Sequence, residues 1–124
     1  MIAVDTSSLV EFLKGSPGRD IDLIEVALAE KNLILPPIVL AEIISDPKLK
    51  TEIKETLQSI PSLQIKDGFW VRAGQLRAIL LGKGRKARLG DALIAQFCVD
   101  YNLPLISRDS DFLIYAKNSK LKLL

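Results

Sequence analysis

Short apolar runs that alternate with longer helical segments constrain the fold of this chain more than any other feature of its sequence. Residues 1–4 (MIAV), 33–36 (LILP) and 104–107 (PLIS) are too short for helices and have the apolar character of buried strands. Strands that are separated by helices tend to pair in parallel, because each crossover returns the chain to the same edge of the sheet. We therefore expect an α/β fold with a mostly parallel central sheet of four or five short strands flanked by helices.

The helical segments follow from apolar spacing and from the residues that begin or stop a helix. Pro37 suits the first turn of a helix and Pro47 suits its end. Residues 63–67 (LQIKD) and 120–124 (KLKLL) are the candidates for the fourth and fifth strands. No break suggests a second domain, so residues 1–124 are expected to form one. Helices are predicted over residues 6–15, 21–32, 37–46, 49–60, 69–81 and 91–102.

Composition excludes several kinds of chemistry. The chain has no histidine, which removes Ser/His and Cys/His catalysis and His-ligated zinc. A single cysteine, Cys98, cannot form an internal disulfide and suits a reducing, cytoplasmic setting. Hydrophobic residues at 48% and charged residues at 26% are ordinary for a soluble globular protein. No signal peptide is recognisable, and no apolar run is long enough to cross a membrane.

Four acidic residues occupy positions where acids are structurally awkward. Asp5 ends the first predicted strand, Asp109 follows the strand at 104–107, and Asp91 begins a predicted helix. Glu42 interrupts the apolar run PPIVLAEIIS, where an unpaired buried charge would cost several kcal/mol. In open α/β sheets ligands bind beyond the carboxyl ends of the strands, where Asp5 and Asp109 fall.

If these acids converge, their mutual repulsion requires a counter-charge. Two unit charges about 5 Å apart repel by roughly 3 kcal/mol at an effective dielectric constant of about 20. A hard divalent cation such as Mg²⁺ or Mn²⁺ suits a site made only of carboxylates. Such a site can orient and activate water against a phosphodiester without a histidine base.

Each acid also has a purely structural alternative, and the sequence leaves these alternatives open. Asp5 and Asp91 could be helix N-caps. Asp109 and Asp111 could be ordinary turn residues. Glu42 could point outward from a partly buried helix. The argument for a common site lies in the coincidence of four acids rather than in any one of them.

Three segments resemble the PIN-domain ribonuclease family. They are residues 3–13 (AVDTSSLVEFL), 40–43 (LAEI) and 90–112 (GDALIAQFCVDYNLPLISRDSDF), of which the last is the most specific. In size and order the chain is most similar to the VapC-type toxins of prokaryotic toxin–antitoxin pairs. The resemblance covers nearly the whole chain, and residues 46–80 are its least specific part.

The resemblance implies roles for individual residues. Asp111 matches an additional acid that many family members have, and Ser107 stands where the family often has threonine. Thr6 and Ser7 match small polar residues of the family, with helix capping as their alternative role. The family's catalytic, Mg²⁺- or Mn²⁺-binding carboxylates match Asp5, Glu42, Asp91 and Asp109.

Basic residues gather immediately before Asp91 in the segment 82–90 (GKGRKARLG). Positive charge near a cleavage site is what binding of an RNA backbone requires. The alternative is a solvated loop whose charges only keep the protein in solution. The predicted RNA-binding residues are Lys83, Arg85, Lys86, Arg88 and, beside Asp109, Arg108.

The function expected from these patterns is a metal-dependent endoribonuclease, the toxin of a toxin–antitoxin pair. The resemblance implies a homodimer and a small antitoxin protein, with the segments 21–28 and 69–81 as candidate interfaces. No membrane partner is expected. One alternative is a PIN nuclease of RNA processing that has no antitoxin. Another is a nucleic-acid-binding module that has kept the fold and lost catalysis.

Overall fold

A computed structural model describes the whole chain, residues 1–124, and places three short strands side by side in one parallel sheet. The strands are β1 (Ile2–Val4), β2 (Leu33–Ile34) and β3 (Leu105–Ile106), in the order β2-β1-β3. The central strand is buried on both sides of the sheet, as its continuous apolar sequence requires. The predicted α/β fold with a parallel sheet is confirmed.

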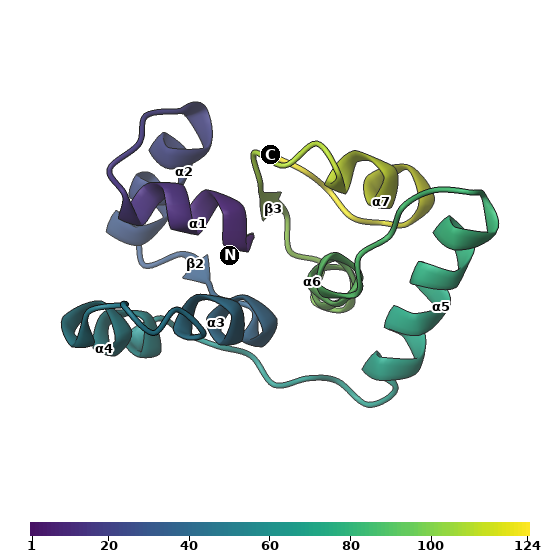
Figure 1. The fold of residues 1–124 in the computed structure, drawn as a ribbon, viewed down its shortest axis with the longest axis horizontal. Helices are drawn as coiled ribbons and strands as arrows, with labels where there is room; N and C mark the ends of the chain where they lie inside the picture. Colours follow the sequence, from purple (N-terminus) through teal and green to yellow (C-terminus); the bar gives the residue numbers. More distant parts are fainter.

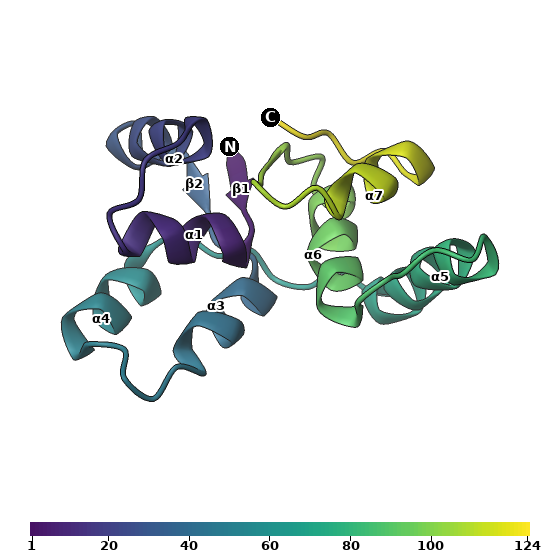
Figure 2. The same cartoon turned by 45° about the horizontal axis from the view of Figure 1, so that its top comes forward.

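Seven helices surround the sheet. Helices α1 and α2 lie on one side of the strands and α6 lies on the other, with α5 and α7 packed against α6 (Figure 1). Turning the molecule shows α3 and α4 together below α1 (Figure 2). The helices are α1 (Thr6–Leu13), α2 (Arg19–Ala29), α3 (Pro37–Ile44), α4 (Thr51–Ser59), α5 (Phe69–Gly82), α6 (Leu89–Asp100) and α7 (Phe112–Asn118).

The number of strands is smaller than predicted. Residues 63–67 do not form a strand, and the segment 120–124 contributes only a single parallel bridge between Leu123 and Leu105. The segment before α5 is instead held to the end of α6, where the Lys66 ammonium donates to the carbonyl of Asp100 (2.9 Å). Side-chain contacts therefore replace the expected strand pairing.

Helix α7 was not predicted, because its seven residues follow a turn rich in Asp and Ser that resembles a loop. It is held in place by burial: Phe112 and Tyr115 are each only 1% exposed. Together with Phe69 and Phe97 they are the largest side chains that are fully buried. The core of the molecule thus extends from the sheet through α6 to α5 and α7. None of the helices is both long and apolar enough to cross a membrane.

Candidate metal centre

The carboxyl ends of β1 and β3 bring Asp5 and Ser107 together. The two strands are parallel neighbours with Val4 opposite Ile106, so the residues that follow them are adjacent. Asp5 is only 2% exposed, and its carboxylate is the N-cap of α1: Oδ1 accepts from the Ser8 amide (2.9 Å). The other oxygen accepts from the hydroxyls of Ser7 (2.9 Å) and Ser107.

Asp5 is therefore a helix cap, and it also lines the pocket described below. An ionised carboxylate has about four acceptor positions, so one remains for a ligand. Burial raises the pKa of Asp5, and the hydrogen bond from Ser107 and those from Ser8 and Ser7 oppose that rise.

Ser107 links the two acids at the strand ends. Its hydroxyl donates to Asp5 and accepts from the backbone amide of Asp109 (3.0 Å). The Asp109 carboxylate in turn accepts from the amide of Asp111 (2.9 Å), a local turn of the kind that Asp favours. The turn predicted as an alternative role for Asp109 is therefore present, and it holds the Asp109 and Asp111 side chains near each other.

Asp91 completes a group of three carboxylates. One oxygen from each of Asp91, Asp109 and Asp111 lies within 4.8 Å of the others. Helix α6 begins at Leu89 with Arg88 as its N-cap, so the alternative role of Asp91 as an N-cap is wrong. Asp91 instead lies in the first turn, where the helix dipole favours an anion.

Glu42 lies at the rim of the same pocket. Helix α3 buries Val39 and Ile43, whereas Glu42 is exposed and its Oε1 accepts from the Thr6 hydroxyl (2.8 Å). The carboxylate in the apolar run is thus not a buried charge. The pocket has a volume of about 210 Å³ and is lined by Asp5, Thr6, Ser7, Glu42, Arg88, Asp91, Ile94, Asp109 and Phe112.

The electrostatics of the pocket favour a cation. Burial raises the pKa of Asp91 to about 6, with further contributions from Asp109, Asp111 and Glu42, and Arg88 opposes the rise. No lysine or arginine forms an ion pair with any of these carboxylates. The donors are all oxygens, which are the ligands that Mg²⁺ and Mn²⁺ prefer. The residues present therefore fit a hard divalent cation.

The predicted basic residues are spread over four places. Arg88 lines the acidic pocket, and Arg85 and Lys86 line a separate groove beside it. Lys83 donates to the side-chain oxygen of Asn118. Arg108 points away from the pocket and forms a bidentate ion pair with Asp20 (2.8 and 3.1 Å).

Sequence reasoning did not single out Lys117, which shares the groove of Arg85 and Lys86. Lys117 lies on α7, which was not predicted, so nothing in the sequence indicated that it would lie next to the basic loop. Tyr115 was also missed. Its buried hydroxyl donates to the Arg88 carbonyl (3.1 Å) and so connects α7 to the start of α6.

Comparison with known proteins identifies the class. The PIN domain family matches residues 2–118, and this chain belongs to that family. The chain is similar to the ribonuclease VapC11 of Mycobacterium tuberculosis, at 28% identity over 129 residues, covering 98% of this chain and 96% of that protein.

Two solved structures have the same fold. VapBC2 from Rickettsia felis, bound to a DNA fragment from its promoter, aligns with a TM-score of 0.75 at 24% identity, covering 100% of this chain and 98% of that one. VapBC-5 from Mycobacterium tuberculosis, a member of the VapBC family of toxin-antitoxin systems, aligns with a TM-score of 0.70 at 22% identity, covering 99% and 96%. At these identities the likeness establishes the fold.

Proposed function

We propose that this protein is a Mg²⁺- or Mn²⁺-dependent endoribonuclease and the toxin of a toxin–antitoxin pair, acting as one PIN domain over residues 1–124. The observation that supports this most is the oxygen-only cluster of Asp91, Asp109 and Asp111 in a pocket that Asp5 and Glu42 also line. The 28% identity to a ribonuclease along nearly the whole chain supports RNA as the substrate.

The carboxylates of Asp91, Asp109 and Asp111 would hold the cation, with Asp5 and Glu42 completing its surroundings. When bound, such a cation neutralises charge on the phosphodiester and activates water for its hydrolysis. Thr6, Ser7 and Ser107 orient Glu42 and Asp5 through the hydrogen bonds described above. Arg88, on the wall of the pocket, supplies positive charge for a phosphodiester oxygen.

Two protein partners belong to the proposal. A small antitoxin is supported by the similarity to VapBC structures, one of which is described as a toxin-antitoxin system. A homodimer is supported by the outer face of α5, which exposes Trp70 and Val71. A nuclease without an antitoxin and an inactive binding module remain the alternatives.

Cleavage of a labelled RNA by the purified protein tests the activity. We expect cleavage with Mg²⁺ or Mn²⁺, none with a chelator, and a loss of at least about 100-fold in Asp91→Asn and Asp109→Asn, because each removes a ligand charge. Asp22→Asn, an exposed acid on α2, is the matched control and should cleave like the wild type. Cleavage that persists in both site variants, or that needs no metal, would refute the proposal.

A further inference from the structure

A groove of about 640 Å³ lies next to the acidic pocket, between α7 and the loop that joins α5 to α6. Asp111 connects the two: its carboxylate belongs to the cluster with Asp91 and Asp109, which line the acidic pocket, and it also lines the groove. Arg85 and Lys86 come from the loop, Ser110 comes from the turn before α7, and Leu113 and Lys117 come from α7 itself. The groove has about three times the volume of the acidic pocket.

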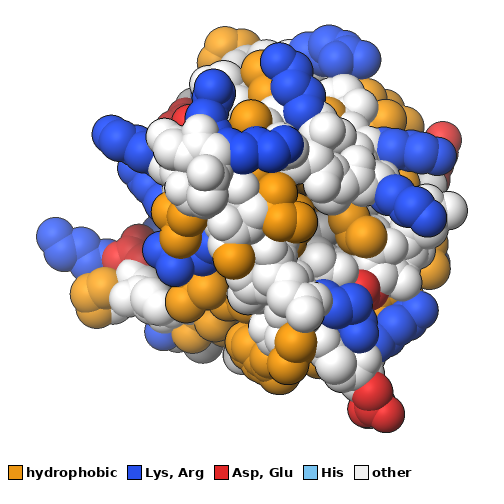
Figure 3. All heavy atoms as spheres, turned by 90° about the vertical axis from the view of Figure 1, so that its right-hand side faces the viewer, with side chains coloured by type: hydrophobic (Ala, Val, Ile, Leu, Met, Phe, Trp, Pro, Cys, Tyr) orange, Lys and Arg blue, Asp and Glu red, His pale blue; other side chains and the backbone are white.

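The three cations of this groove have no partner within the protein. Arg85, Lys86 and Lys117 are exposed, and none of their side chains forms an ion pair or a hydrogen bond. Elsewhere in the molecule Arg72 and Arg108 each form a bidentate ion pair with an aspartate. The face built by α5, α7 and their neighbouring loops accordingly shows many basic and few acidic side chains (Figure 3).

The walls of the groove are fixed to one another. The Arg77 guanidinium donates to the Ala87 carbonyl (2.7 Å), which fastens the end of the loop to α5. The Tyr115 hydroxyl donates to the Arg88 carbonyl (3.1 Å), which fastens it to α7, and Lys83 donates to Asn118 at the other end. The backbone that carries the three cations is therefore held before a ligand arrives, which lowers the entropy that binding costs.

We propose that this basic groove binds the stretch of single-stranded RNA next to the scissile phosphodiester, through contacts from Arg85, Lys86 and Lys117 to backbone phosphates. The inference rests on the proposed ribonuclease activity and deepens it. A phosphodiester at the carboxylate cluster would have its neighbouring phosphates beside the groove, because Asp111 belongs to the cluster and lines the groove. The groove has no aromatic lining for base stacking, so its contribution is expected to be independent of base sequence.

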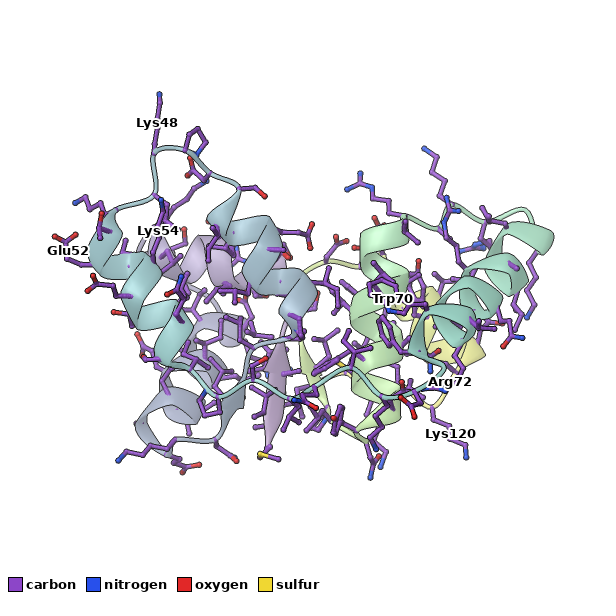
Figure 4. All side chains as sticks on the ribbon, turned by 90° about the horizontal axis from the view of Figure 1, so that it is seen from below. Lys48, Glu52, Lys54, Trp70, Arg72 and Lys120 are labelled. Atoms are coloured by element: carbon purple, nitrogen blue, oxygen red, sulfur yellow. The ribbon has the colours of Figure 1, made fainter.

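Binding of a fluorescent oligouridine over a salt series, without divalent metal so that no cleavage occurs, tests the groove directly. For single-stranded nucleic acid each phosphate contact contributes about −0.7 to the slope of log affinity against log salt. Lys86→Ala/Lys117→Ala should flatten that slope by about 1.4. Lys48→Ala/Lys54→Ala removes the same charge from α4 and the loop before it, at the far end of the molecule from α5 (Figure 4), and should leave the slope unchanged.

The outcomes separate this inference from the proposed activity. With active enzyme, Lys86→Ala/Lys117→Ala should raise KM for a long RNA while kcat stays the same, because the groove contacts are made before and during the reaction alike. A slope equal to that of the wild type would overturn the inference, and so would weakened binding of poly-glutamate with unchanged RNA binding, which would assign the groove to an acidic protein. Wild-type protein that cleaves no RNA would refute the activity, while the salt slope would still decide the groove.

Discussion

The Asp5 carboxylate caps α1 and borders the acidic pocket at the same time, with three of its acceptor positions filled by Ser7, Ser8 and Ser107. Its two roles were alternatives in the sequence and are combined in the structure. A helix cap needs one carboxylate oxygen, which here is Oδ1, while Oδ2 accepts from the hydroxyls of Ser7 and Ser107. Asp91 differs from Asp5, because it is not the N-cap of its helix and it lies near the carboxylates of other acidic residues.

Asp91 should make the metal-free protein less stable as pH rises. Its pKa is about 6 in the folded protein against an ordinary 3.8, so the folded state binds the proton more tightly than the unfolded state. The stability that this gives is complete below about pH 4 and is lost as pH rises through about 6. The difference in pKa corresponds to at most about 3 kcal/mol, and solvent screening of this half-buried carboxyl reduces it to about 1–2 kcal/mol.

Urea unfolding of wild type and Asp91→Asn from pH 4.5 to 7.5, in the presence of a chelator, checks this expectation. Relative to the wild type, the variant should gain about 1–2 kcal/mol in free energy of unfolding across this range. Asp20 and Asp100 have lowered pKa values, so the stability that they contribute is lost on acidification. This contribution is the same in both proteins and cancels in the difference between them. Parallel stability curves for the two proteins would contradict the assignment.

The positions of the pocket acids were easier to predict from the sequence than the partners of the basic residues, and the metal-binding role of these acids stays a prediction. Strand ends and a helix start located Asp5, Asp109 and Asp91, because local patterns determine where those elements stop. The partner of Arg108 could not be read from its neighbour Asp109. Its guanidinium pairs with Asp20, 88 positions away, because the loop after β3 packs beside the start of α2.

At the scale of elements, the pocket is assembled from the end of β1, the loop after β3 and the first turns of α1 and α6, with α3 at its rim. The parallel sheet and six of the helices followed from periodicity. The sequence pattern wrongly predicted two further strands and did not predict α7. A single bridge and a seven-residue helix depend on tertiary packing rather than on local pattern.

The loop that carries Ser107 and Asp109 is positioned by its contact with α2. Arg108 pairs with Asp20, and its backbone amide donates to the Ser8 hydroxyl (2.9 Å). Gly18 makes this approach possible: its φ is 152°, and a Cβ there would lie 3.0 Å from the Arg108 guanidinium. We expect this clamp to hold Asp109 where the carboxylate cluster needs it.

Asp20→Asn should therefore weaken Mn²⁺ binding by about 10-fold, the lower range for residues that support metal ligands. Asp100→Asn is the matched control, because Asp100 also accepts a bidentate bond from an arginine, Arg72, between α5 and α6. Both variants should lose about 1 kcal/mol of stability in urea. Calorimetric titration with Mn²⁺ distinguishes them, and equal metal affinity in the two variants would show that the clamp is structural only.

At the scale of the whole molecule, α5 exposes more apolar surface than a helix of a monomer normally does. Trp70 is 64% exposed, Val71 65%, Ile79 49% and Leu81 47%, while the opposite face of α5 packs on α6. A helix that is apolar on all sides is normally buried, and large exposed apolar patches mark interfaces. Helix α2, the other candidate interface, exposes Val26 and Leu28 among charged residues.

We expect the protein to be a dimer in solution through α5, with Trp70 at the interface. Sedimentation velocity should show dissociation to a monomer in Trp70→Glu, whereas Val26→Ser on α2 should remain a dimer, because only the first change places a charge in the apolar contact. Trp70 is the only tryptophan in the chain, so its emission should shift to longer wavelength as dilution exposes it to water. A wild-type monomer at micromolar concentration, or dissociation caused by Val26→Ser, would rule out the α5 interface.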